Sequence, residues 1–315
     1  RLMKKAIVTG INGMDGRFMA KLLLGKGYEV YGLARTSLSF ETAGVKYIYG
    51  DLANSEDISK LIMRVEPDEI YNLGAQSHIK LSWSDPKYTL LVNGTSVIDF
   101  MDCIRRKFPH TKFFNAASSE IFGYPMESPQ CEETKLNPRN PYGTAKLYAY
   151  NMVKHYREKY GIFACSGILF NHESELRSLN MVTRKITNSV ARIHLGLTDK
   201  IILGDLDATR DWGYAGDYVN AMWMILHHKK ADDYVISTGK SRTIKDFLDT
   251  AFSVVGISDW NKYVTIDSNL KRHKEKVSLV GDCSKLKRIG WRTITSFNDM
   301  VTKMVMYDIK ELQDI

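Results

Sequence analysis

A glycine-rich turn near the amino terminus is the feature that most constrains how this chain folds. It occupies Thr9–Gly16 and joins a short apolar strand, Lys5–Val8, to a helical pattern of apolar residues. Gly10 permits a tight turn, Gly13 lets the backbone approach a pyrophosphate, and Gly16 lets helix and strand pack closely. Three glycines alone are weak evidence. Their place between a strand and a helix predicts a dinucleotide site, with the helix N-terminus facing the anion.

Strands and helices keep alternating after this turn, with short connections. Strands are expected at residues 28–33, 46–49, 69–73 and 112–117, and helices at about 55–65, 87–106 and 141–159. This alternation predicts an α/β fold with a doubly wound parallel (Rossmann) sheet. From about residue 171 the alternation weakens, which predicts a smaller, interleaved substrate-binding lobe.

The two predicted lobes share the chain unevenly. The Rossmann lobe should comprise residues 1–170 with a returning segment at about 201–230, and the substrate-binding lobe residues 171–200 and 231–315. Within the returning segment, both Ile201–Leu203 and the stretch 212–228 should lie on the side of the main sheet. Four of its residues have helical spacing that indicates core packing: Tyr218, Met222, Trp223 and Met224.

The charge balance leaves two classes of partner open. The chain has 315 residues and a formal net charge of +8, with the basic excess concentrated in residues 271–276 and 285–288. Because aromatic residues are not interleaved with these charges, we expect no nucleic-acid partner. A diphosphate-bearing small molecule explains the same balance.

Cysteines and apolar runs exclude other classes. The cysteines are far apart and form no CxxC pair, so we expect neither a disulfide framework nor a metal site. No apolar run approaches the roughly 18 residues of a membrane span, and the amino end lacks a secretory apolar region. We therefore expect a cytoplasmic protein with no membrane partner.

The end of the second expected strand indicates which dinucleotide binds. Arg35, Thr36 and Ser37 follow this strand, and no acid occurs until Glu41. An NAD site normally places a carboxylate here to bind the ribose 2′-hydroxyl, whereas an arginine beside hydroxyls suits a 2′-phosphate. The sequence therefore favours NADP over NAD. The alternative is an arginine that merely solvates the strand end.

A second polar stretch has the composition of an active site. Ser118–Glu120 follow an expected strand, and Asn140 and Pro141 suit the N-cap and first position of a helix. Tyr142 and Lys146, four residues apart, should then share one face near the helix start. This spacing is also common on solvated helices, and the dinucleotide turn is what favours the catalytic interpretation.

The same spacing predicts an acidic tyrosine. An ammonium about 4 Å from the Tyr142 hydroxyl, in an effective dielectric near 20, favours the phenolate by about 4 kcal/mol. This corresponds to roughly three pKa units and moves the pKa from about 10 towards about 7. A general base is most useful in that range.

Several motifs together resemble one family. They are Thr-Gly-x-x-Gly-x-x-Gly at 9–16, Asn-Leu-Gly-Ala-Gln-Ser-His at 72–78, Ser-Ser-Glu at 118–120, Tyr-x-x-x-Lys at 142–146, Asn-His-Glu-Ser at 171–174, Val-Thr-Arg-Lys-Ile at 182–186, Leu-Gly at 203–204 and Arg-Asp-Trp-Gly at 210–213. With them the chain resembles the extended short-chain dehydrogenase/reductase family, and within it the GDP-mannose 4,6-dehydratases, over nearly its whole length.

The resemblance implies site residues by position. The implied NADP contacts are Gly10, Asn12, Gly13, Met14, Asp15, Gly16, Arg35, Thr36, Ser37, Asp51, Leu52, Leu73, Gln76, Ser77, Tyr88, Lys146, His172 and Arg177. The implied contacts to a GDP-linked sugar are Ser119, Asn171, Val182, Lys185, Leu203, Gly204, Arg210, Arg272 and Glu275.

The resemblance also implies a reaction, the NADP-dependent 4,6-dehydration of a GDP-linked sugar by a homodimer or homotetramer. Tyr142, beside Lys146, would remove the O4 proton as C4 is oxidised, and Ser118 would hold O4. Glu120 would take the C5 proton and assist loss of the C6 hydroxyl, because only a carboxylate among these groups can do both.

Other interpretations stay open at this point. A 4-keto reductase or 4-epimerase would use the same tyrosine and lysine but would need no base over C5, so Glu120 is the discriminating residue. A non-catalytic NADP-binding protein is a third interpretation. Within the dehydratase interpretation, the sugar is either mannose or a manno-heptose.

Overall fold

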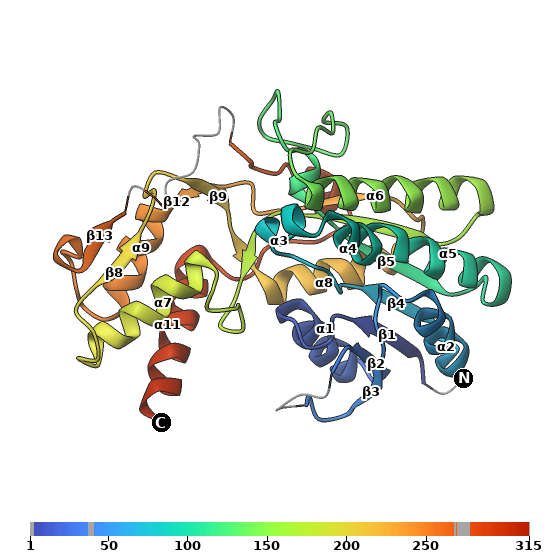
Figure 1. Cartoon of the computed structure of the whole chain (residues 1–315), viewed down its shortest axis with the longest axis horizontal. Helices are drawn as coiled ribbons and strands as arrows, with labels where there is room; N and C mark the ends of the chain where they lie inside the picture. The colour runs from blue at the N-terminus through green and yellow to red at the C-terminus, as the bar shows by residue number, and fades with distance from the viewer. Residues whose placement is uncertain (1–2, 37–40, 268, 270–277, 315) are drawn as a thin grey trace.

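The structure is a computed structural model that describes residues 3–36, 41–267, 269 and 278–314. A large lobe is built around a parallel sheet, and a smaller lobe of helices and short strand pairs lies beside it (Figure 1). Among the described helices, none combines the length and apolar character that crossing a membrane requires.

The main sheet has seven strands that all pair in parallel. In spatial order they are β3 (Val45–Tyr49), β2 (Glu29–Ala34), β1 (Lys5–Thr9), β4 (Glu69–Asn72), β5 (Lys112–Ser118), β6 (Ala164–Leu169) and β11 (Tyr234–Ile236). The direction of winding reverses between β1 and β4. Ligands of such sheets bind outside the carboxyl ends of the strands at this reversal. The predicted doubly wound sheet is confirmed.

Both faces of the sheet are buried, because successive side chains of a strand point to opposite sides. On β5, Phe114 belongs to the core of one face and Phe113 to the core of the other. The helices α1 (Met14–Gly25) and α8 (Ala215–Leu226) cover the first face, and α2 (Ser55–Val65), α5 (Ser96–Lys107) and α6 (Pro141–Tyr160) cover the second. Burial on both sides accounts for the apolar runs that made these strands predictable.

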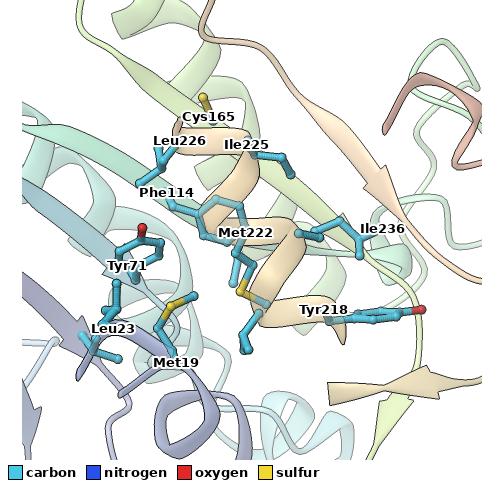
Figure 2. Close-up of a cluster of buried hydrophobic side chains, with 14 of the residues drawn as sticks. Met19, Leu23, Tyr71, Phe114, Cys165, Tyr218, Met222, Ile225, Leu226 and Ile236 are labelled. Atoms are coloured by element: carbon cyan, nitrogen blue, oxygen red, sulfur yellow. The ribbon is translucent and has the colours of Figure 1, made fainter. Parts of the chain in front are cut away.

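The helix α8 returns to the sheet from far along the chain. Its buried side chains belong to the core on the first face of the sheet. Met222 points toward Met19 of α1, whereas Tyr218 points away from it and stacks on the His172 ring at a centroid distance of 4.7 Å (Figure 2). Tyr218 and Met222 are fully buried, and Trp223 and Met224 pack partly buried at the edge of the same core. The predicted core role of this helical pattern is confirmed.

The single helix expected over residues 87–106 is wrong. The chain forms α4 (Pro86–Leu90), then a π-helical turn at Leu91–Thr95, and then α5. A Cβ on Gly94 would lie only 3.3 Å from the carbonyl oxygen of Ala145 in α6, so this glycine lets the wide turn pack directly on α6. Apolar spacing continues through the turn, and for this reason the sequence pattern did not reveal it.

The smaller lobe has its own core between α7 (Val182–His194), α9 (Ile244–Val254) and α11 (Phe297–Gln313). A buried ion pair joins two of these helices, with the Arg184 guanidinium 2.6 Å from the Asp308 carboxylate. The Thr187 hydroxyl donates to the same carboxylate at 2.7 Å. These bonds stabilise the buried Asp308 carboxylate, whose charge would be costly to bury without partners.

Two strands lie elsewhere than the sequence suggested. β8 (Ile201–Leu203), expected on the side of the main sheet, pairs with β13 (Val264–Ile266) and packs in the core of the smaller lobe. β11, expected in the smaller lobe, pairs with β6 as an edge strand of the main sheet. Short apolar triplets carry no signal of which sheet they join. The division of the chain near residue 170 stays a prediction.

The remaining elements are short. They are α3 (Ile79–Ser84), a 3-10 turn at Ser119–Ile121, β7 (His172–Glu173), β9 (Thr209–Asp211), β10 (Gly213–Tyr214), β12 (Ser241–Thr243), a 3-10 turn at Asn261–Tyr263 and α10 (Ser284–Arg288).

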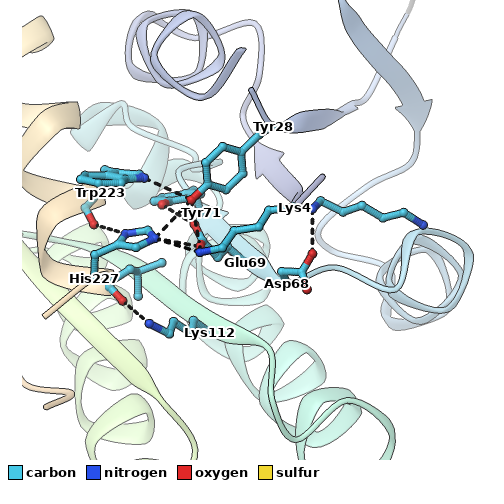
Figure 3. A network of polar contacts seen from close by, with 10 residues as sticks. Lys4, Tyr28, Asp68, Glu69, Tyr71, Lys112, Trp223 and His227 are labelled. Carbon is cyan, nitrogen blue, oxygen red and sulfur yellow. Dashed lines mark hydrogen bonds and ion pairs between the residues drawn. The ribbon is translucent and has the colours of Figure 1, made fainter. Parts of the chain in front are cut away.

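A buried carboxylate secures the amino-terminal edge of the sheet. Glu69, at the start of β4, is 1% exposed and accepts hydrogen bonds from the Tyr28 and Tyr71 hydroxyls and the Lys4 ammonium (Figure 3). His227, which follows α8, lies 3.0 Å from it. Burial by itself would raise the pKa of Glu69, but His227, Tyr71 and Lys4 lower it to about 2. This network ties three strands to α8.

The lowered pKa of Glu69 predicts how stability depends on pH. Because the folded-state pKa lies below the ordinary value of 4.5, the carboxylate stabilises the fold fully above pH 4.5 and loses this effect as the pH falls towards 2. The shift corresponds to about 3 kcal/mol. We expect Glu69→Gln to lower the free energy of unfolding by about this amount near pH 6 and by less than half of it near pH 3. Urea unfolding at both pH values measures the difference.

Glu56→Gln is the matched control, because the Glu56 side chain is 71% exposed and, among the described residues, forms an ion pair with Lys60 alone, on the surface. It should change the free energy of unfolding by less than about 1 kcal/mol at either pH. An effect of Glu69→Gln that is the same at both pH values contradicts the proposed titration.

Candidate active site

A cleft of about 720 Å³ lies at the carboxyl ends of β1, β2, β3 and β4, where the winding of the sheet reverses. Most predicted cofactor residues line it: Gly10, Asn12, Gly13, Met14, Asp15, Gly16, Arg35, Thr36, Asp51, Leu52, Leu73, Gln76, Ser77, Tyr88 and Arg177. Lys146 and His172 are not part of its wall, and Ser37 lies outside the described residues. The structure thus brings together residues from distant segments, and their contacts with a ligand stay a prediction.

The glycine turn leaves no room for side chains at two positions. Gly10 has φ +63°, and a Cβ there would lie 2.7 Å from the Cα of Gly74 after β4. A Cβ on Gly16 would lie 2.1 Å from the Gly10 carbonyl oxygen. Backbone groups therefore form the floor of the cleft, as a pyrophosphate site requires. The buried Oδ1 of Asn12 has no hydrogen-bond partner among the described residues, which is consistent with a ligand-facing turn.

The wall of the cleft is held by polar residues that sequence analysis partly missed. Arg35 donates a hydrogen bond to the Tyr88 hydroxyl at 2.9 Å, so two predicted cofactor residues meet at the rim. The Asn93 side chain fixes the backbone of Gln76. It accepts a hydrogen bond from the Gln76 N–H and donates one to the Gln76 carbonyl, both at 2.8 Å. Thr89 contacts the Gln76 side chain. An asparagine followed by glycine inside an apolar helical pattern was the available signal for Asn93.

The helix α6 begins as predicted. The Asn140 side chain accepts a hydrogen bond from the Gly143 N–H at 2.7 Å, and Pro141 occupies the first helical position. Lys146 is buried and donates to the Ala116 carbonyl of β5 at 2.7 Å. Its ammonium lies 5.9 Å from the centre of the Tyr142 ring. The predicted shared face of Tyr142 and Lys146 is confirmed.

The predicted effect of Lys146 on Tyr142 is wrong for the protein by itself. The pKa of Tyr142 is raised to about 12. Burial is the main cause and the Glu120 carboxylate adds to it, while the hydrogen bond with Ser118 lowers the pKa. Burial also lowers the pKa of Lys146 to about 8, against the opposing effect of Asp15. The expectation counted the attraction between phenolate and ammonium but not the cost of removing both charges from water.

Glu120 lies directly beside this pair of residues. The Asn140 amide donates to its carboxylate at 2.9 Å, and the Arg139 guanidinium lies 3.9 Å away. The Ser118 hydroxyl accepts from the Glu120 N–H at 3.2 Å, which fixes the turn after β5. A hydroxyl, a carboxylate, a phenol and an amine are therefore grouped where β5 ends and α6 begins. Such a group can move protons at both oxygen and carbon atoms.

A buried ion pair links the glycine turn to the segment after β6. The Asp15 carboxylate lies 2.8 Å from His172 Nε2, and the Arg177 guanidinium bonds to Glu173 at 2.7 Å. Burial opposes the charged form of His172, but Asp15 raises the pKa of its imidazole above the ordinary value. Burial likewise opposes ionisation of Asp15, but His172 and Arg177 lower its pKa. These bonds hold Arg177 at the wall of the cleft.

The predicted substrate residues are spread over several elements. Ser119 is buried in the turn after β5, and Lys185 of α7 donates to the Ile202 carbonyl of β8 at 2.6 Å. The others that the structure describes are Asn171 after β6, Val182 on α7, Leu203 and Gly204 at the end of β8, and Arg210 on β9. None of these residues lines the large cleft, and Arg272 and Glu275 lie outside the described residues. Their role stays a prediction.

A second cavity, of about 230 Å³, lies between β10, β12 and the start of α11. Lys240 and Arg242 line it, together with Thr295 and Ser296. None of the predicted site residues is among its lining residues. In the described part of the chain, no three or more His, Cys, Asp or Glu side chains are grouped so as to hold a metal ion.

The fold defines a protein of the Rossmann class, in which a tyrosine, a lysine, a serine and a glutamate are grouped at the carboxyl edge of the main sheet. The family described as GDP-mannose 4,6 dehydratase matches residues 7–304. GDP-mannose 4,6 dehydratase 2 of Arabidopsis thaliana is 43% identical over 330 residues, covering 98% of this chain and 87% of its own length. The Homo sapiens GDP-mannose 4,6 dehydratase is 41% identical over 339 residues, covering 97% and 91%. The chain belongs to the GDP-mannose 4,6-dehydratase family, and the resemblance is confirmed.

Solved structures agree on the fold. The UDP-glucose 4-epimerase from Thermotoga maritima, solved with UDP-glucose, superposes with a TM-score of 0.88 at 19% identity, covering 98% of this chain and 99% of its own. At this identity the likeness shows the architecture alone. It supports the placement of the sheet and of the smaller lobe.

The glycine turn generates a direct prediction. Gly16→Ala places a methyl group against the Gly10 carbonyl, so the turn must shift; we expect a loss of stability of about 1–3 kcal/mol and a lower affinity for NADP, the predicted ligand. Gly25→Ala, at the other end of α1, is the control because its Cβ meets nothing within 4 Å. That variant should be neutral or slightly more stable.

Thermal unfolding and calorimetric titration with NADP measure both variants. If Gly16→Ala and Gly25→Ala bind NADP equally well, the close approach at Gly16 does not shape the nucleotide site.

Proposed function

We propose that this protein catalyses the 4,6-dehydration of a GDP-linked sugar, GDP-mannose or GDP-manno-heptose, to the 4-keto-6-deoxy product, with NADP as its cofactor. The observation that carries the proposal is the carboxylate of Glu120 beside Ser118 and Tyr142, in a chain that belongs to the dehydratase family. A 4-reductase or 4-epimerase has no step that needs this carboxylate, so the grouping favours a dehydratase.

The residues of the cleft fit a nicotinamide dinucleotide. The backbone floor at Gly10 and Gly16 would hold the pyrophosphate, and the orphaned Asn12 oxygen marks a place for a ligand donor. At the rim, Arg35 and Thr36 would hold the 2′-phosphate that distinguishes NADP. A nicotinamide held in this cleft would supply hydride transfer, from C4 of the sugar and back to C6.

The residues of the chain do the proton chemistry. Tyr142 removes the O4 proton, and the Ser118 hydroxyl holds that oxygen through a hydrogen bond. Glu120 takes the C5 proton, which the neighbouring ketone acidifies, and donates it to the C6 hydroxyl, which departs as water. As the hydride returns to C6, C5 takes up a proton, which Tyr142 supplies from the one it removed from O4. Lys146, held by the Ala116 carbonyl, orients the cofactor side of the site. One carboxylate thus serves first as a base and then as an acid.

The raised pKa of Tyr142 constrains this sequence. A phenol with a pKa of about 12 is protonated at neutral pH, so Tyr142 must lose its own proton before it can accept the O4 proton, and the bound cofactor and substrate would have to lower its pKa. The lowered pKa of Lys146, about 8, leaves this amine able to exchange a proton near neutral pH. The two buried groups are therefore suited to act together.

We further infer a homodimer or homotetramer. Leu90, Leu91 and Tyr148 are each more than a third exposed. Leu90 of α4 and Tyr148 of α6 both lie against Gly94, and Leu91 begins the π-helical turn next to Leu90, so the three form one apolar patch. Such helix faces pair in isologous contacts. The mass of the assembly in solution decides between two copies and four.

The function is tested by mass spectrometry of GDP-sugars incubated with the purified protein and NADP. The proposal expects a product that has lost one water from GDP-mannose or its heptose analogue, without any added reductant. An unchanged mass for both sugars, or a product that gains two hydrogens only when NADPH is supplied, contradicts it.

The position of Arg35 predicts cofactor selectivity. An arginine that pairs with a 2′-phosphate contributes about 1.5–3 kcal/mol, so NADP should bind more tightly than NAD by tenfold or more. Arg35→Ala should remove most of this difference. Tyr88→Phe, which removes the hydroxyl partner of Arg35 but leaves its charge, should reduce the difference only partly. Equal affinities of the unmodified protein for the two dinucleotides exclude this role for Arg35.

The roles of Glu120 and Tyr142 predict that variants of the two residues stop the reaction at different steps. Tyr142→Phe should prevent C4 oxidation, so no reduced nicotinamide forms with substrate. Glu120→Gln keeps the shape of the side chain but not the base, so oxidation proceeds and water loss slows by about 10²–10⁴-fold. Absorbance of the reduced nicotinamide and deuterium uptake at C5 in D₂O separate the two. Normal water loss by Glu120→Gln would mean that another residue is the base.

A further inference from the structure

We propose that Asn140 positions Glu120 for water elimination, in addition to capping the helix that carries Tyr142. This inference rests on the proposed dehydratase function. It assigns to one amide side chain the alignment of two catalytic residues that act on different bonds of the sugar.

Asn140 uses both ends of its side chain amide. Its Oδ1 accepts the hydrogen bond from the Gly143 N–H at 2.7 Å, which is an ordinary N-cap contact. Its Nδ2 donates to Glu120 Oε2 at 2.9 Å. The residue itself is 7% exposed, so water competes little for either bond. The start of α6 and the carboxylate are thereby joined through a single rigid group.

The N-cap contact alone does not explain the choice of asparagine. Serine and aspartate cap helices about as well as asparagine does. A serine at this position lacks the amide donor, and an aspartate would place a second carboxylate beside Glu120. Of these three residue types, asparagine alone combines a cap acceptor with a neutral amide donor for the carboxylate.

A backbone contact keeps the same two segments together. A Cβ on Gly143 would lie 2.6 Å from the Glu120 carbonyl oxygen, so the first turn of α6 packs directly against the turn that carries Glu120. The Ser118 hydroxyl accepts from the Glu120 N–H, which fixes the other side of that turn. The backbone of Glu120 is therefore held from two sides, and Asn140 fixes the direction of its carboxylate.

The charged neighbour of Glu120 is farther away than the amide. Arg139 Nε lies 3.9 Å from the same Oε2 and packs over the Tyr124 ring at 5.5 Å. An arginine at this distance attracts the carboxylate without imposing a direction, whereas a hydrogen bond at 2.9 Å has a preferred angle. Orientation of Glu120 therefore depends on Asn140 more than on Arg139.

The chemistry gives this orientation a specific consequence. Oxidation at C4 uses Tyr142 and Ser118, and it does not need Glu120. Removal of the C5 proton does need the carboxylate, and small displacements of a general base reduce the rate strongly. Loss of the Asn140 amide should therefore slow the second step of the reaction and spare the first.

The test compares Asn140→Ser with the unmodified enzyme. The serine keeps the helix cap, so the melting temperature and the KM for the GDP-sugar should be little changed. The kcat for water loss should fall about tenfold to hundredfold, the usual effect of losing a hydrogen bond to a charged group. Reduced nicotinamide should accumulate during turnover, because oxidation continues while elimination slows. A purely structural role for Asn140 would not produce this accumulation.

Two further variants keep the inference falsifiable. Asn140→Asp also retains the cap and replaces the donor by a like charge, so it should slow water loss at least as much as Asn140→Ser and again accumulate reduced nicotinamide. Asn54→Ser makes the same exchange at the N-cap of α2, where the side chain accepts a hydrogen bond from the Glu56 N–H and, within the described part of the chain, contacts no carboxylate. It should leave turnover unchanged.

The outcomes separate this inference from the proposed function. If the unmodified enzyme removes no water from either GDP-sugar, the proposed function fails. If the unmodified enzyme is active and Asn140→Ser and Asn140→Asp remove water at its rate, Asn140 does not position Glu120. Equal loss of C4 oxidation and water loss in both variants also overturns the inference, because the residue would then act only on the helix.

Discussion

The site depends on two places where backbone approaches backbone more closely than a side chain would allow. At Gly16 an added Cβ would lie 2.1 Å from the Gly10 carbonyl oxygen, and at Gly143 it would lie 2.6 Å from the Glu120 carbonyl oxygen. The first contact lets α1 begin directly behind the nucleotide cleft. The second lets α6 begin directly against the turn after β5. The cleft and the group of Ser118, Glu120, Tyr142 and Lys146 therefore lie at the same edge of the sheet, where both helices start.

Burial opposes the charged form of an ionisable group, but the net shift of its pKa depends on the partners buried with it. Glu69 and the Asp15–His172 pair are buried with partners that stabilise their charged forms, so they hold the fold together. Tyr142 and Lys146 are buried without sufficient compensation, and their pKa values are shifted towards the neutral forms. Neighbouring ionisable groups whose pKa values are shifted by burial are typical of active sites.

Short sequence patterns predicted the features that depend on neighbouring residues in the chain. The glycine turn, the cap at Asn140 and the strands β1 to β5 of the main sheet follow from short stretches of sequence, and the structure has them. The pairing of β8 with β13 depends on residues far apart in the chain, so its apolar triplet gave no indication. The pKa of Tyr142 failed as a prediction because it depends on how completely the surrounding chain excludes water. Asn93 was missed because a π-helical turn leaves the apolar spacing intact.

The most direct test of the account follows one hydrogen atom through the reaction. GDP-mannose, or its heptose analogue, carrying deuterium at C4 is incubated with the purified protein and NADP, and the product is examined by NMR. The account predicts a 4-keto product with the deuterium at C6, because the hydrogen removed in the first step returns in the last. Deuterium that stays at C4, or that is lost from the sugar altogether, would contradict internal 4,6-dehydration.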